Sequence, residues 1–124
     1  MHLPRAMEDY LKTIWILQRE NGSVRSLDVA ETLHVSKPSV SRAMKLLREG
    51  GLLTIGADKR LTLTDAGREA AEQVYRKHRA LRTLLISLGV RPETAERDAC
   101  GMEHIVSDET LDSIVEHIGE EVAP

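Results

Sequence analysis

The residues best suited to chemistry lie in the stretch DACGMEHIVS, residues 98–107, which contains the only cysteine of the chain. Cys100, Glu103 and His104 stand at positions i, i+3 and i+4, a spacing that places three side chains on one face of a helix. A thiolate, a carboxylate and an imidazole are all ligands for divalent transition metals. Three ligands from one helix rarely complete a coordination shell, so we expect further ligands from elsewhere in the chain.

His78 and Asp9 are the candidates for those further ligands. His78 interrupts an apolar stripe at helical spacing, and Asp9 lies off the apolar stripe of the first expected helix. A histidine in such a stripe is also consistent with a hydrogen-bonded core residue, and a lone cysteine with a small buried hydrophobic residue. The spacing alone therefore leaves a metal site and a buried core open as alternatives.

A nucleophilic pair of Cys100 and His104 is disfavoured. The sequence contains no oxyanion-hole pattern and no substrate-loop pattern to accompany such a pair. We therefore do not expect an enzyme.

Hydrophobic periodicity and capping residues predict three helices, a β-hairpin and three further helices. The first helix follows Pro4 and breaks at ENGS, residues 20–23; Ser26 caps the second, and Ser36 caps the third, which has Pro38 in its first turn. The hairpin covers residues 52–64, Thr64 caps a long helix over residues 65–88, and the last two helices begin at Pro92 and Ser107. The fold class is therefore mainly α-helical.

The third helix carries the side chains that a DNA-reading helix requires. Short polar and basic residues lie off its apolar stripe, namely Ser36, Lys37, Ser39, Ser41, Arg42 and Lys45. Arg42 suits a bidentate contact to guanine, whereas Lys37 and Lys45 suit phosphates. Lys59 and Arg60 stand at the hairpin tip, where a wing contacts DNA. Two short helices followed by a hairpin predict a winged helix-turn-helix, although a solvated helix face would explain the charges alone.

The charge distribution agrees with two lobes that have different tasks. Residues 1–64 carry ten Lys and Arg against seven Asp and Glu, whereas residues 65–124 carry seven against thirteen, within a net charge of −3. We expect a DNA-binding domain over residues 1–64 and a helical domain over residues 65–124. No apolar run suits a membrane span and no signal pattern is present, so we expect a cytoplasmic protein with no membrane partner.

Four segments resemble the metal-dependent repressors of the diphtheria-toxin-repressor and manganese-transport-regulator family: MEDYLKTIWIL, VSKPSVSRAMKLL, LTLTDAGREAAEQVYRKH and RDACGMEHIVSDE. The resemblance implies a homodimeric winged-helix repressor of metal-uptake or metal-homeostasis genes that binds double-stranded operator DNA. It implies metal ligands at Cys100, Glu103 and His104, an N-terminal ligand at Asp9 and a second-site histidine at His78. The implied base-contacting positions are Ser36, Pro38, Ser39, Ser41 and Arg42.

Some residues depart from each branch of that family. Asp9 is typical of the manganese branch, whereas Cys100 is typical of the iron branch; Glu96 replaces a histidine of the iron branch and Arg82 replaces a glutamate. We therefore expect one main site of Asp9, Cys100, Glu103 and His104, with His78 and Glu96 in a weaker second site.

The choice of metal follows from the ligand types. Fe(II) is the first choice because of the Cys100 element and Mn(II) is the alternative, while Ni(II), Co(II) or Zn(II) should substitute in vitro. Two rival functions remain open at this point. One is a winged-helix regulator that answers a small molecule without metal, and the other is a zinc-stabilised interaction module that never binds DNA.

Overall fold

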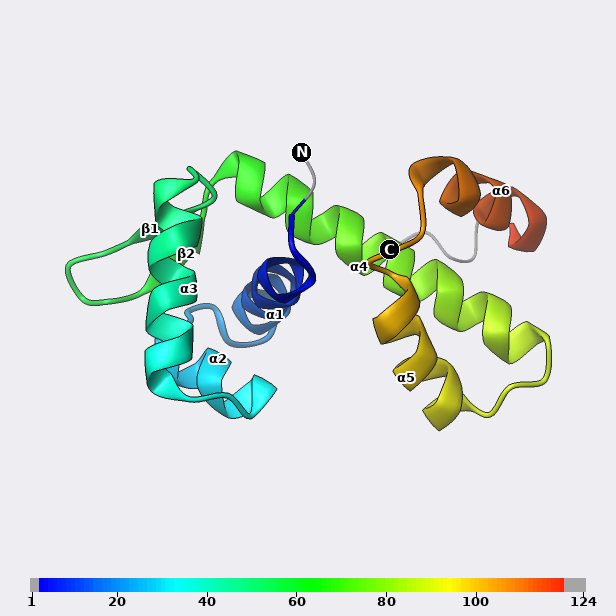
Figure 1. Cartoon of the computed structure of the whole chain (residues 1–124), viewed down its shortest axis with the longest axis horizontal. Coiled ribbons are helices and arrows are strands. Elements are labelled where there is room, and N and C mark those ends of the chain that lie inside the picture. The colour runs from blue at the N-terminus through cyan, green and yellow to red at the C-terminus, as the bar shows by residue number, and fades with distance from the viewer. Residues whose placement is uncertain (1–2, 120–124) are drawn as a thin grey trace. The chain divides into compact units, whose positions relative to one another are not determined.

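A computed structural model describes residues 3–119 of the chain, which divide into two compact units between residues 72 and 73 (Figure 1). The boundary between the units falls within one long helix, α4. The order of elements is three helices, a two-stranded sheet and three further helices, which confirms the predicted fold class. The bounds are α1 (Arg5–Asn21), α2 (Ser26–Leu33), α3 (Lys37–Glu49), β1 (Leu53–Ile55), β2 (Leu61–Leu63), α4 (Asp65–Ser87), α5 (Pro92–Met102) and α6 (Asp108–Ile118).

The N-terminal unit has a core shared by its three helices and the hairpin. Apolar residues at helical spacing in α1, α2 and α3 are buried in this core. Helix α3 also packs against β1 (Figure 1). The largest fully buried side chains of this unit are Leu11, Ile14, Val24, Val29, Val40, Met44 and Leu53. This packing holds α3 firmly while its opposite face remains exposed.

The start of α3 is stabilised by the predicted capping residue, whereas the start of α2 is stabilised by a different residue from the one predicted. The Ser36 hydroxyl accepts a hydrogen bond from the Ser39 backbone N–H at 3.3 Å, and Pro38 lies in the first turn. Ser26 lies inside α2, so its prediction as the cap is wrong. The Arg25 backbone N–H instead donates to the Asp28 carboxylate at 2.9 Å, which closes the first turn from within the helix.

The hairpin pairs Leu53 with Leu63 and Ile55 with Leu61 in an antiparallel register. At its tip, the Gly56 N–H donates to the Arg60 carbonyl at 2.9 Å. Lys59 takes a left-handed conformation with φ 67°, which turns the chain back. Lys59 and Arg60 are both exposed and lie at the tip of the hairpin, where the sequence predicts them.

The start of α4 is fixed against the segment that leads into the hairpin. The Thr64 hydroxyl accepts from the Gly67 N–H at 3.1 Å, as its predicted capping role requires, and donates to the Gly51 carbonyl at 2.7 Å. A Cβ at Gly67 would overlap the carbonyl oxygen of Leu52. The helix therefore approaches this backbone more closely than any other residue type would allow.

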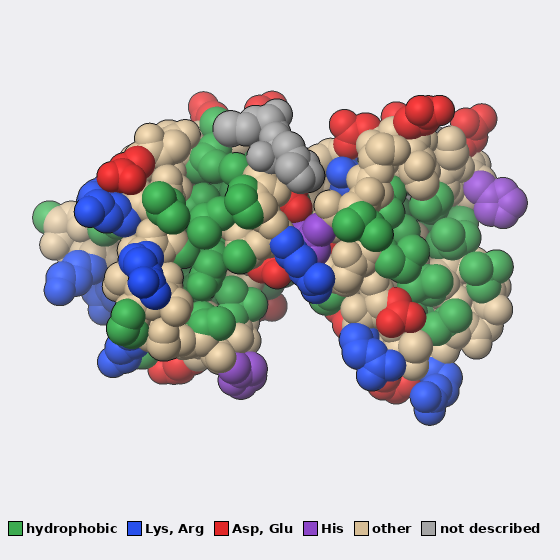
Figure 2. All heavy atoms as spheres, viewed as in Figure 1, with side chains coloured by type: hydrophobic (Ala, Val, Ile, Leu, Met, Phe, Trp, Pro, Cys, Tyr) green, Lys and Arg blue, Asp and Glu red, His purple; other side chains and the backbone are tan. Residues whose placement is uncertain are grey.

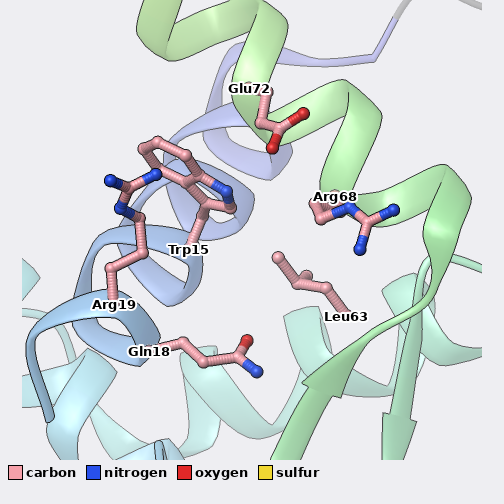
Figure 3. Close-up of a pocket in the computed structure, with 6 residues that line it drawn as sticks. All are labelled: Trp15, Gln18, Arg19, Leu63, Arg68 and Glu72. Carbon is pink, nitrogen blue, oxygen red and sulfur yellow. The ribbon is translucent and has the colours of Figure 1, made fainter. Parts of the chain in front are cut away.

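A hollow of about 310 Å³ opens between α1, β2 and the first turns of α4 (Figure 3). The Arg19 guanidinium lies over the indole of Trp15, 4.6 Å from the ring centroid, and forms one wall. The other lining residues are Gln18, Leu63, Arg68 and Glu72. Apart from Trp15 they are partly or fully exposed, so this hollow is a surface feature of the N-terminal unit.

The C-terminal unit comprises the second part of α4 with α5 and α6. Ala80 and Leu111 are fully buried, and apolar residues before and along α6 pack against them: Val106, Ile114, Val115 and Ile118. The Lys77 ammonium donates to the Val106 carbonyl at 2.8 Å and pairs with Asp108 at 3.4 Å. These contacts attach the beginning of α6 to α4. Among residues 3–119, no helix is both long and apolar enough to cross a membrane.

Candidate functional site

Three residues of the C-terminal unit form a cluster of metal-ligating side chains. His78 comes from α4, while Cys100 and Glu103 come from the end of α5, and one ligand atom of each lies within 4.8 Å of the others. His78 Nδ1 is 2.8 Å from Glu103 Oε1 and 3.8 Å from Cys100 Sγ. Imidazole, thiolate and carboxylate together suit a divalent transition metal, so the donor set fits such an ion.

Of Cys100, Glu103 and His104, only Cys100 lies within helix α5. Helix α5 ends at Met102; Glu103 is its C-terminal cap, with φ −59°, and its N–H still donates to the Ala99 carbonyl at 2.9 Å. His104 lies in the following turn, which tightens as the Ile105 N–H donates to the Met102 carbonyl at 3.1 Å. The prediction that one helix carries all three residues is therefore wrong, because the chain turns before His104.

Glu103 and His104 are nevertheless both withdrawn from solvent. The side chain of Glu103 is 0% exposed and that of His104 is 3% exposed, with His104 Nε2 at 3.6 Å from Glu103 Oε2. A buried carboxylate is costly unless a positive charge or hydrogen-bond donors face it. Two imidazoles face Glu103, which makes this carboxylate the centre of the cluster.

The two carboxylates around His78 change its ionisation. Burial lowers the pKa of His78, but hydrogen bonds to Glu103 and Glu96 and the negative charges of these carboxylates together outweigh that effect, so the pKa is raised from its ordinary 6.5. His78 Nε2 lies 2.8 Å from Glu96 Oε2, on the ring edge opposite Glu103. When protonated, His78 therefore donates one N–H to each carboxylate.

Arg82 also contacts the carboxylate of Glu96. In the sequence, Arg82 stands out only because it replaces a glutamate of the iron branch of the family. Its Nε lies 3.3 Å from Glu96 Oε2. The one sequence signal for its role is the i, i+4 spacing of His78 and Arg82 in α4, which puts both side chains on one helix face. Nothing local in the sequence indicates that Glu96 of α5 faces them.

Asp9 lies on α1 in the N-terminal unit, where its side chain is partly buried. It lines a small hollow of about 180 Å³ beside Tyr10, Leu33 and Val35. Its role as a ligand remains a prediction.

The predicted DNA-contacting residues lie on the free face of α3 and on the wing. Ser39 is partly buried and the others are exposed: Ser36, Lys37, Pro38, Ser41, Arg42, Lys45, Lys59 and Arg60. Lys and Arg side chains gather over α3 and the hairpin (Figure 2). The Ser36 hydroxyl also donates to the Ser39 hydroxyl at 2.8 Å, so these two side chains are held in place before any contact with DNA.

Comparison with known proteins supplies the family. Residues 2–61 match the family model described as the N-terminal DNA-binding domain of iron-dependent repressors, and residues 64–121 match the model of their metal-binding and dimerisation domain. The chain belongs to this family of metal-dependent repressors. It is therefore a metal-dependent transcriptional repressor, as the sequence resemblance implied at this level.

Relatives of both metal types occur among the curated proteins. The chain is 40% identical over 112 residues to the transcriptional regulator MntR of Escherichia coli, covering 90% of this chain and 72% of that protein. It is 37% identical over 103 residues to the iron-dependent repressor IdeR of Mycobacterium tuberculosis, covering 82% of this chain and 45% of that protein. The family contains both kinds of regulator, so membership alone does not name the metal.

Solved structures of family members share the fold. A manganese-dependent transcriptional repressor in complex with manganese has a TM-score of 0.83 and 38% identity, with 91% of this chain and 52% of that chain covered. The metal-dependent regulator MtsR has a TM-score of 0.84 and 33% identity, with 90% and 53% covered. Both support the winged-helix and helical-domain architecture of this family member.

Proposed function

We propose that this chain is an Fe(II)-activated homodimeric repressor of metal-uptake or metal-homeostasis genes, acting on double-stranded operator DNA in the cytoplasm. Residues 1–64 would form the DNA-binding domain and residues 65–124 the metal-binding and dimerisation domain. The observation that carries the proposal is the group of His78, Cys100 and Glu103, whose ligand atoms lie within 4.8 Å of one another. Cys100 and Glu103 are proposed ligands of the main site, and His78 is a proposed member of the second. No catalytic activity is part of this function.

The ligand set proposed for the main site is Asp9, Cys100, Glu103 and His104. Cys100, Glu103 and His104 belong to the C-terminal unit, and Asp9 brings a carboxylate from α1 of the N-terminal unit. His78 and Glu96 belong to a weaker second site that shares residues with the first.

The thiol of Cys100 favours Fe(II) over Mn(II), because a soft sulfur ligand suits iron better than manganese. Asp9 and the manganese regulators among the relatives support Mn(II) as the alternative. Ni(II), Co(II) and Zn(II) should bind at least as tightly in vitro, since affinity for such ligands rises along the first transition row. Affinity measured for one ion is therefore not enough to name the physiological metal.

The proposed mechanism couples the two units. A bound divalent ion supplies positive charge that carboxylates of both units can share. Asp9 then restrains α1, and with it the DNA-binding unit, relative to Glu103 and His104. The recognition helices of a dimer must enter successive major grooves about 34 Å apart, so a narrower range of unit orientations favours DNA binding. A coupling free energy of about 1–3 kcal/mol suffices for such a switch.

Exposed apolar residues of the C-terminal unit support the proposed homodimer. Leu88 is 70% exposed and Ile105 is 82% exposed. Leu88 follows directly after the last residue of α4 and Ile105 lies in the turn between α5 and α6. Apolar side chains lie together on the surface of this unit (Figure 2).

The test is an anaerobic titration of the purified full-length protein with Fe(II) and with Mn(II), followed by binding to genomic DNA fragments. We expect metal-dependent binding that a chelator abolishes. Cys100→Ala and Asp9→Ala should each remove the metal dependence while circular dichroism shows the fold intact. Glu20→Ala removes an exposed carboxylate at the other end of the same helix, so it is the matched control and should retain the metal response.

Two outcomes would contradict the proposal. DNA binding that is insensitive to chelators would favour a winged-helix regulator that responds to a small molecule. Absence of salt-dependent binding to duplex DNA would instead favour a zinc-stabilised interaction module.

A further inference from the structure

The imidazole of His78 is held from both edges. Its Nδ1 faces the buried side of the cluster, 2.8 Å from Glu103 Oε1 and 3.8 Å from Cys100 Sγ. Its Nε2 faces the other way, 2.9 and 2.8 Å from the two carboxylate oxygens of Glu96. The ring can therefore offer only Nδ1 to an ion that Cys100 and Glu103 also bind.

Glu96 has a second partner that reduces its value as a metal ligand. Arg82 Nε lies 3.3 Å from Glu96 Oε2, the same oxygen that is 2.8 Å from His78 Nε2. A guanidinium carries a permanent positive charge and repels a cation approaching the carboxylate that it faces. A carboxylate that is already shared between a guanidinium and a ring nitrogen is better suited to accept hydrogen bonds.

Two helices present these groups with matching spacing. His78 and Arg82 stand one turn apart on α4, while Glu96 and Cys100 stand one turn apart on α5. On α5, the turn that contains Cys100 lies beside His78 Nδ1. The preceding turn of α5 places Glu96 beside His78 Nε2 and Arg82. The pairing is therefore built by rigid elements rather than by a loop.

We propose that Glu96, oriented by Arg82, is a positioning residue for the metal centre. It accepts the Nε2–H of His78 and so presents Nδ1 to an ion held by Cys100 and Glu103. Metal-bound histidines are commonly oriented in this way by a carboxylate on their other nitrogen. This inference rests on the proposed function and assigns Glu96, within the weaker second site, the task of holding His78.

The proton count follows from this assignment. In the metal-free protein, both ring nitrogens can carry a proton, one donated to Glu103 and the other to Glu96. When Nδ1 becomes a ligand, its proton leaves to solvent and the Nε2 proton stays on the hydrogen bond to Glu96. The neutral tautomer that remains is the one that Glu96 stabilises.

The experiment uses the whole 124-residue chain with Cd(II), which accepts thiolate ligands and is not oxidised. Cd(II) enriched in its NMR-active isotope is added to protein whose histidines carry NMR-active nitrogen. In the wild type we expect scalar coupling between the metal and His78 Nδ1, with Nε2 protonated. Glu96→Ala should weaken Cd(II) binding by about 10- to 100-fold and weaken the preference for Nδ1.

Three further variants distinguish the orienting role of Glu96 from the effect of its negative charge and from a general effect on folding. Glu96→Gln keeps an oxygen that can accept the Nε2–H, so it should retain Nδ1 coordination and lose less affinity than Glu96→Ala. Arg82→Ala, at an exposed position, should shift affinity in the same direction by a smaller factor. Glu93→Ala removes an exposed carboxylate one turn earlier on α5 and should change neither readout.

The outcomes distinguish this inference from the function on which it rests. Coupling to Nε2, no coupling to either nitrogen of His78, or an unchanged affinity and tautomer in Glu96→Ala overturns the positioning role, while Cd(II) bound at Cys100 still supports the metal site. A wild-type protein that binds no Cd(II) through Cys100 overturns both.

Discussion

At the scale of single residues, the distinctive feature is a buried carboxylate flanked by imidazoles. Glu103 is 0% exposed at its side chain, and His78 lies 2.8 Å away. When His78 is protonated, it provides the positive charge that a buried carboxylate needs. The raised pKa of His78 expresses this pairing, since its charged form is favoured by Glu103 and Glu96.

This pairing predicts a pH dependence for the stability of the metal-free protein. The pKa of His78 is raised in the folded state, so the folded state binds the proton more tightly than the unfolded chain does. The stabilisation is therefore fully present below about pH 6.5, the unfolded value, and is lost as the pH rises through the raised pKa. We expect urea unfolding with chelator present to show a free energy of unfolding that falls over that interval.

His78→Gln is the control for this pH effect. Glutamine retains hydrogen-bonding groups but does not titrate, so the difference between the two unfolding curves isolates His78 from the other titrating groups. The same slope in both proteins above about pH 6.5 would show that the carboxylates do not hold the His78 proton.

At the scale of elements, we propose that the exposed face of α3 makes contacts of two different kinds with DNA. Arg42 is proposed to read a base, whereas Lys45 is proposed to contact a phosphate. Arg42→Ala should cost about 1–3 kcal/mol at one operator position and relax the preference there. Lys45→Ala should weaken binding to all sequences and reduce the salt slope by about one, because one phosphate is no longer neutralised. Binding assays on operator variants at several salt concentrations check both, and equal effects of the two changes would contradict the distinction.

The junction between the hairpin and α4 depends on the absence of a side chain at Gly67. An added Cβ would overlap the Leu52 carbonyl, so the backbone must shift. Gly67→Ala should destabilise the protein by about 1–3 kcal/mol in urea unfolding. Gly101→Ala is the matched control, since a Cβ there meets nothing within 4 Å and alanine favours a helix. A Gly67→Ala protein as stable as the wild type would show that α4 can move away without cost.

At the scale of the whole molecule, the proposed repressor requires two copies of the chain. Ile105 is 82% exposed, next to His104 of the metal centre. Burying one such side chain contributes about 1.5–3 kcal/mol, so Ile105→Glu should raise the dimer dissociation constant at least about tenfold. Sedimentation velocity over a range of concentrations measures this change. Leu46→Glu, at a 57% exposed position on α3, is the control and should leave dimerisation unchanged.

The sequence by itself determined the order of elements and most of their ends. Ser36, Thr64 and Ser107 cap helices through short-range hydrogen bonds, and Gly22 ends α1 with φ 82°. These features involve residues within a few positions of each other, so local patterns are sufficient to predict them. The basic face of α3 follows from the same periodicity, because the apolar stripe specifies which side remains exposed.

Only the tertiary structure decided how the metal-ligating side chains meet. The contacts of His78 with Glu96, Cys100 and Glu103 join residues 18 to 25 positions apart, and no local pattern indicates which ring nitrogen faces which partner. The pairing of Arg82 with Glu96 and the end of α5 at Met102 also depend on this packing. The reason is that spacing along one helix determines which residues share a face, whereas the neighbour of that face is set by how separate helices bury their apolar surfaces.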